Sequence, residues 1–200
     1  MEKFYLEMPT LERKIEALEY LQEHVNCNSK MNGTGGLKKC LNEITYEEWI
    51  EELKNCMNKE YFESKNLVPA TTYFTIREND NKIIGMVNFR HYLNEELRNV
   101  GGHIGYGIRP SERRKGYAKI QLYLTLIEAK KLGLNEVMID CIDTNIGSEK
   151  TIQALGGVFE KEYYDVNNNE VFHNYWINVD KSLDKYKDIY EQYIAKEKVK

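Results

Sequence analysis

A glycine-bearing strand that runs through a basic turn into a long helix constrains this chain more than any other feature. The expected strand covers residues 102–108, and a turn containing Pro110 follows it. Residues 115–132 form the clearest helix, because small or apolar residues share one face: Ala118, Leu122, Thr125, Leu126, Ala129 and Leu132. The next strand is expected at residues 136–142, so this part of the chain predicts a parallel crossover.

A short strand at 4–8 and two helices are expected before residue 71. Thr10 is expected to cap the first helix, whose apolar face would comprise Leu11, Ile15, Leu18, Leu21 and Val25. Thr45 and Glu48 form a capping box that opens the second helix, which would continue through about residue 58. Two further segments are expected to be a loop and a connection: 28–36 and 61–70.

Hairpins flank the crossover on both sides. Their strands are expected at 71–77, 82–89, 158–166 and 171–177. A helix is expected at 146–155, and a charged amphipathic helix at 182–198. The predicted fold class is α/β, loosely α+β, with a single domain over residues 1–200. We expect one mixed, mostly antiparallel central sheet of about seven strands, with helices on both faces.

Composition excludes several classes of protein. A net charge of -4 argues against a nucleic-acid-binding protein, which is usually basic. No run of apolar residues approaches the roughly 18 that a membrane span needs, and the N-terminus carries charges where a signal peptide would be apolar. The four cysteines are scattered, which predicts reduced thiols and a cytoplasmic location. The four histidines show no paired ligand spacing, so we expect no metal.

The turn before the long helix has the composition of an anion-binding site. Four cations lie within it, Arg109, Arg113, Arg114 and Lys115, and Gly116 stands at the first turn of the helix. A helix N-terminus offers free N–H groups and roughly half a positive charge. Local physics therefore predicts a phosphate-bearing ligand here, while the plain alternative is a solvated basic turn.

The strand before this turn contains Gly105 and Gly107, which weaken a strand unless a bulge or a close-approaching ligand needs the space. We expect a bulge that splays this strand from its neighbour and leaves main-chain N–H groups free to polarise a carbonyl. The GxxxxGK[ST] string of a P-loop does not occur, and Arg109-Pro110 interrupts a GxGxxG fingerprint. Both nucleotide-binding motifs are therefore excluded.

Residues 113–118, RRKGYA, match the Q/R-x-x-G-x-G/A motif of the GNAT superfamily of N-acetyltransferases. The longer string 101–118 resembles a poorly characterised bacterial branch of predicted acetyltransferases, and residues 140–157 are similar to the strand and helix that follow in the family. The resemblance covers about residues 71–178. It implies a GNAT-like fold and acetyl-CoA as cosubstrate. The implied cosubstrate-binding residues are Ile108, Arg109, Arg113, Arg114, Lys115, Gly116, Tyr117, Ala118, Asn145 and Ser148.

The resemblance also implies direct transfer of the acetyl group to an amine. Some base must remove the proton of that amine, and His103 is the candidate, because its unperturbed pKa of roughly 6.5 suits the task. Family members commonly carry a tyrosine as general acid where this chain has Ile152; water, Tyr163 or Tyr164 could take that role. The candidate acceptor-binding residues are a polar group past the third strand: Asn88, Arg90 and His91.

The expected acceptor is a primary amine of a small molecule, with no nucleic acid or membrane as partner. Two alternatives stay open: a non-catalytic acyl-CoA-binding or sensor domain, and a protein N-acetyltransferase. A longer acyl chain than acetyl also stays open. The C-terminal helix is expected to pack on the sheet or on a partner subunit, which leaves a homodimer as a further expectation.

Overall fold

Seven strands form two antiparallel sheets in the computed structural model, which describes residues 1–56, 58–65 and 67–195. The first sheet has the order β1-β2-β3-β4 and the second β5-β7-β6. The bounds are β1 Phe4–Glu7, β2 Ala70–Arg77, β3 Lys82–Arg90, β4 Ile104–Ile108, β5 Glu136–Ile142, β6 Val158–Asp165 and β7 Glu170–Asn178. The expected number of strands and the mixed fold class are confirmed.

The two sheets meet at His103 and Met138 and do not form the single sheet that was expected. The amide of His103 donates to the carbonyl oxygen of Met138 at 2.8 Å, and the amide of Met138 donates to Nδ1 of His103 at 2.9 Å. β4 and β5 form no ladder within the described residues. The expectation of one continuous sheet is therefore corrected: the strands on either side of the crossover diverge after this junction.

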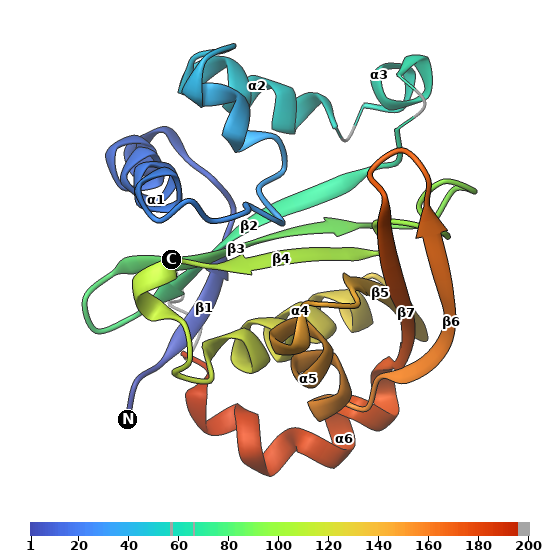
Figure 1. Cartoon of the computed structure of the whole chain (residues 1–200). Coiled ribbons are helices and arrows are strands. Elements are labelled where there is room, and N and C mark those ends of the chain that lie inside the picture. The colour runs from blue at the N-terminus through green and yellow to red at the C-terminus, as the bar shows by residue number, and fades with distance from the viewer. Residues whose placement is uncertain (57, 66, 196–200) are drawn as a thin grey trace.

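Helices cover the sheets on both faces (Figure 1). Helices α1 Lys14–Asn26, α2 Tyr46–Asn55 and α3 Lys59–Ser64 precede β2 and lie on one side, and α4 Tyr117–Lys131, α5 Ile146–Ala154 and α6 Val179–Tyr190 lie on the other. One apolar cluster joins α1 and α2 to the first sheet, and a larger one joins α4, α5 and α6 to both sheets. α4 is buried on nearly every side, because it lies between the sheets and the two helices.

Three expectations about the helices need correction. The predicted apolar face of α1 is largely exposed, with Ile15 at 76%, because the buried face consists of Ala17, Tyr20, Leu21 and His24. The connection expected at 61–70 includes α3. The C-terminal helix begins earlier than predicted, at Val179, and ends at Tyr190 before a 3-10 turn, Glu191–Tyr193; residues 196–198 of that prediction lie outside the described residues.

Local signals located some of the other helix ends: the side chain of Thr10 makes no capping hydrogen bond, and a 3-10 turn, Leu11–Arg13, separates it from α1, but the start of α2 was predicted correctly. Thr45 and Glu48 form the predicted capping box, with each side chain accepting a hydrogen bond from the other residue's amide. The helix they open ends at Asn55 rather than at about residue 58. Within the described part of the chain, no helix combines the length and the apolar character needed to cross a bilayer.

Candidate functional site

The turn between β4 and α4 has the backbone shape of an anion-binding nest. Arg114 has a φ of 63° and Gly116 a φ of 86°, so two left-handed residues lie close together just before the helix. Left-handed residues next to right-handed ones point successive N–H groups into one concavity. Gly116 suits this position because left-handed backbone costs an L-residue roughly 1–2 kcal/mol.

The amides where this turn enters α4 are free. Among the described residues, none accepts a hydrogen bond from the amides of Gly116, Tyr117 or Ala118. A Cβ built on Gly116 would have no heavy atom within 4 Å, so no protein side chain fills the space above it. The start of α4 therefore offers main-chain donors and the positive end of a helix dipole to solvent.

A second set of free amides lies along the outer edge of β4. The amide of Arg109 donates to Ile84 O at 2.8 Å, and the amide of Arg90 donates to His103 O at 2.7 Å. In this register the amides of the odd-numbered residues of β4 point toward β3. Because amides alternate along a strand, those of Tyr106 and Ile108 face away from β3. No residue in the described ranges accepts a hydrogen bond from either amide.

This edge is free because β4 does not pair with β5 among the described residues, and not because β4 is bulged. The pairing of β3 with β4 runs without a register shift; the bulges lie at Thr75/Ile76 and Phe159/Lys161. The predicted bulge in β4 is therefore wrong. The strand glycines serve a close approach of the chain itself: a Cβ on Gly107 would lie 2.9 Å from the carbonyl oxygen of Asn32, in the loop that follows α1.

The four cations of the turn have different surroundings. Arg113 donates from Nε to the carbonyl oxygen of Ile108 at 3.0 Å and from Nη2 to Ser29 Oγ at 2.6 Å. Lys115 pairs with Glu112 at 2.8 Å. Arg109 is buried, with its guanidinium over the ring of Tyr20 on α1. The side chain of Arg114 is exposed.

Glu112 anchors the turn to the β2–β3 hairpin. Its carboxylate contacts Arg77 at 2.9 Å and Lys82 at 2.9 Å, in addition to Lys115. Burial of the carboxyl group opposes ionisation, but hydrogen bonds from Lys115, Lys82 and Arg77 outweigh it and lower the pKa of Glu112 to about 2. The carboxylate is therefore ionised at neutral pH and fixes the position of the turn.

The start of α5 faces the free edge of β4. Asn145 caps this helix by accepting the amide of Ser148 at 3.2 Å, and the hydroxyl groups of Ser148 and Tyr106 lie 2.8 Å apart. Burial raises the pKa of Tyr106, so its hydroxyl keeps its proton at neutral pH. The sequence motifs pointed to Asn145 and Ser148 but not to Tyr106, which only the folded chain brings to them.

His103 lies at the junction of the two sheets. Its ring is buried beside Trp176, and burial, followed by the charges of Arg90 and Arg98, lowers the pKa of His103 to about 4. Since Nδ1 accepts the amide of Met138, the neutral ring carries its proton on Nε2 and has no free lone pair. The base role of His103 stays a prediction, and this geometry favours a structural role.

The three candidate acceptor-binding residues have separate partners. Asn88 donates to Thr72 Oγ1 at 3.1 Å, and His91 Nε2 lies 2.9 Å from Thr71 Oγ1. Arg90 donates to the carbonyl oxygens of Gly101 and Gly102. Asn88 and Arg90 share one face of β3, while His91 lies against Phe89 on the other. The structure thus brings two of the three together.

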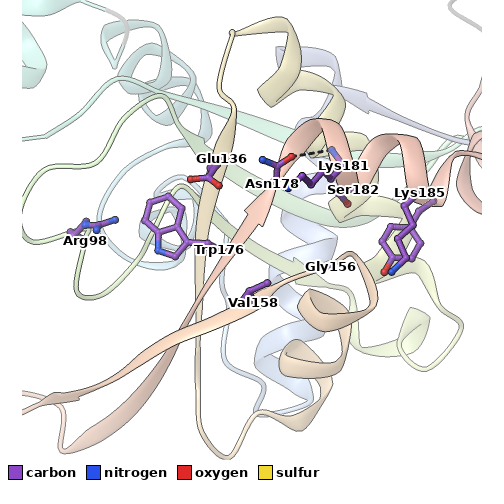
Figure 2. Close-up of a pocket in the computed structure, with 10 residues that line it drawn as sticks. Arg98, Glu136, Gly156, Val158, Trp176, Asn178, Lys181, Ser182 and Lys185 are labelled. Atoms are coloured by element: carbon purple, nitrogen blue, oxygen red, sulfur yellow. Dashed lines mark hydrogen bonds between the residues drawn. The ribbon is translucent and has the colours of Figure 1, made fainter.

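An open hollow lies at the other end of the second sheet. Figure 2 shows it around Trp176, between Arg98 and the lysines of α6, with Glu136 at the start of β5 and Asn178 at the end of β7. None of the residues that line this hollow belongs to β4 or to the turn at 109–118, so the hollow is separate from the free amides. Among the described residues, no group of three or more His, Cys, Asp or Glu side chains could hold a metal ion.

Comparisons with known proteins identify a family and a shared fold. The family model described as "Acetyltransferase (GNAT) domain" matches residues 12–158. No curated protein matches the sequence.

Solved structures share the fold at low sequence identity. A ribosomal-protein-S5-alanine acetyltransferase from Vibrio fischeri is 20% identical, with a TM-score of 0.65 over 90% of this chain and 95% of that one. The microcin C7 self-immunity acetyltransferase MccE, in complex with acetyl-CoA and AMP, is 17% identical, with a TM-score of 0.61 over 88% and 92%. A chimera of the spermidine N-acetyltransferase SpeG from Vibrio cholerae is 16% identical, with a TM-score of 0.57 over 91% and 99%.

Proposed function

The chain belongs to the GNAT acetyltransferase family, and we propose that it transfers the acetyl group of acetyl-CoA directly to a primary amine of a small acceptor. The observation that carries the proposal is the open turn after β4, where the amides of Gly116, Tyr117 and Ala118 have no acceptor within the described residues. Free main-chain donors at a helix N-terminus bind phosphate oxygens well. Acetyl-CoA supplies a pyrophosphate of that chemistry together with a reactive thioester.

In this proposal, residues 113–118 bind the pyrophosphate mainly through the main chain. Arg113, Arg114 and Lys115 are all exposed, but among the described residues the side chain of Arg114 makes no hydrogen bond or ion pair, so it would add its charge to the nest. Arg113 and Lys115 shape the turn through their contacts with Ser29 and Glu112. Arg109 is buried, with its guanidinium over Tyr20, so in this proposal it supports the turn and its contact with phosphate stays a prediction.

The free edge of β4 would hold the pantetheine arm and the thioester. The amide of Ile108 lies next to the nest in the chain and faces away from β3, as does that of Tyr106. Main-chain donors aimed at a carbonyl oxygen stabilise the charge that develops there during acyl transfer. Asn145 and Ser148, at the start of α5, would border the arm on its other side.

The amine must lose a proton before or during transfer, because a lysine-like amine has a pKa of about 10.4. His103 would serve as the base only if its bond with the Met138 amide opened, so we assign no proton transfer to it. Asn88 and Arg90 lie on the face of β3 that the 28–36 loop covers, and there they would orient the acceptor. Acetyl transfer needs no metal in this proposal.

The test is release of free thiol from acetyl-CoA across a panel of small amines and N-terminal peptides, with Gly116→Asp as the inactive control. Mass spectrometry of the product identifies the acylated group. Thiol release with a small amine that Gly116→Asp abolishes supports the proposal. Turnover with peptides alone would favour a protein N-acetyltransferase. Tight binding without turnover would favour a sensor domain.

A further inference from the structure

Building on the proposed function, we propose that Glu23, on α1, is a positioning residue that holds the phosphate-binding turn in its binding shape. Its Oε1 accepts a hydrogen bond from the amide of Ser111 at 2.7 Å. Its Oε2 lies 3.3 Å from Nε of Arg109. One carboxylate from the N-terminal helix therefore contacts the turn on both sides of Pro110.

A second contact ties the same region of the chain to the turn. Ser29, six residues after Glu23, accepts the hydrogen bond from Arg113 Nη2 at 2.6 Å. The loop that continues from Ser29 lies directly on β4, since a Cβ on Gly33 would meet the carbonyl oxygen of Gly105 and the Cα of Tyr106. α1 and its following loop are thus fixed to the turn and to the strand that carries the free amides.

The charges at this contact indicate why a carboxylate is needed. Arg109 is only 4% exposed and packs over Tyr20, so its guanidinium requires a nearby anion in a largely dry setting. Glu23 supplies that anion, with its Oε2 3.3 Å from Nε of Arg109. A carboxylate beside an anion site would by charge alone oppose phosphate binding, and Arg109 offsets that charge.

The effect on binding follows from preorganisation. Arg113 lies directly before the left-handed Arg114, and Ser111 lies two residues earlier. Contacts that fix Ser111 and Arg113 therefore restrict the backbone that leads into Arg114 and Gly116. A turn already held in its bound shape loses less conformational entropy when the ligand binds. Without the Glu23 contact, the turn should sample shapes in which its amides no longer converge.

The experiment is calorimetric titration of CoA into wild type, Glu23→Ala, Glu23→Gln and the control Glu19→Gln, which is exposed on the same helix. We expect Glu23→Ala to weaken binding about tenfold or more, since hydrogen bonds to charged groups are worth roughly that much. Glu23→Gln should recover part of the loss, because its amide oxygen can still accept from Ser111. Glu19→Gln should match wild type.

Two results would overturn the inference while the proposed function stands. Equal affinities of wild type and Glu23→Ala would show that the contact does not shape the turn. Equal losses in Glu23→Ala and Glu23→Gln, in step with a lower melting temperature, would show general damage to the fold. A wild type that binds no CoA would instead refute the proposed function itself.

Discussion

Tyr106 on β4 and Ser148 on α5 join their hydroxyl groups at 2.8 Å across the space where the two sheets have no ladder. The main-chain amide of Tyr106 thus belongs to the free edge of β4, while its hydroxyl group contacts the start of α5. The bond fixes the start of α5, and with it Asn145, against the strand proposed to hold the thioester.

Removal of the Tyr106 hydroxyl separates main-chain from side-chain binding. We expect Tyr106→Phe to lower the free energy of unfolding by about 1 kcal/mol, the typical value of one hydrogen bond. The affinity for CoA should change less than about threefold, because the amides of Tyr106 and Ile108 remain in place. Urea unfolding and calorimetry measure the two quantities. A large loss of affinity would assign the arm to side chains instead.

Gly116 tests the nest by charge. A side chain at this position meets no protein atom, and both Asn and Asp tolerate left-handed backbone better than other L-residues. Gly116→Asp should abolish CoA binding because its carboxylate occupies the anion site, whereas the matched, uncharged Gly116→Asn should lose less than about tenfold. Calorimetric titration measures both. Undiminished affinity in Gly116→Asp would refute the phosphate-binding role of the turn.

Glu112 makes stability depend on acidic pH. Its folded pKa of about 2 lies below the ordinary value of 4.5, so the unfolded chain binds the proton more readily. The stabilisation is complete above pH 4.5 and is lost as pH falls toward 2. Urea unfolding of wild type and Glu112→Gln between pH 6 and 3 measures this difference.

At neutral pH we expect Glu112→Gln to cost about 3 kcal/mol, because it leaves three cations without their buried partner. Glu51→Gln is the matched control, since it breaks an exposed pair with Lys54 and should cost less than about 1 kcal/mol. A pH dependence that is identical in wild type and Glu112→Gln would show that Glu112 is not the group responsible.

His103 can be tested with a substitution that keeps the hydrogen bond but removes the base. The side-chain oxygen of His103→Asn can accept the amide of Met138, so this variant should keep near-normal stability and turnover. His103→Ala should cost about 1–3 kcal/mol of stability, because the amide of Met138 loses its acceptor. Thiol release and urea unfolding measure both variants. A fall in turnover of about 10²–10⁴ in both would restore His103 as the base.

Much of the fold could be predicted because its signals are local. The capping box of α2, the hairpin turns and the glycine before α4 depend on residues next to one another. The apolar face of α1 was mispredicted for the opposite reason. Tyr20 lies under the guanidinium of Arg109 and packs against the ring of His24, and an aliphatic repeat does not report such contacts.

The splaying of β4 and its free N–H groups were expected, but from a bulge that the pairing with β3 does not contain. Gly105 and Gly107 are compatible with a bulge, but the folded chain uses them to seat the 28–36 loop, whose position is set by distant residues. The motif predicted the nest itself, because the nest depends on a local feature, a left-handed glycine immediately before a helix start. Glu23, Ser29 and Tyr106 carry no spacing signal, since they reach the site from separate elements.

The most direct test is to follow the main-chain amide resonances of the isotope-labelled protein by nuclear magnetic resonance while CoA is added. The amides of Gly116, Tyr117 and Ala118 should show the largest saturable shifts, and those of Tyr106 and Ile108 should shift with them. Shifts confined to the hollow around Trp176, or an absence of saturable shifts at the start of α4, would contradict the account.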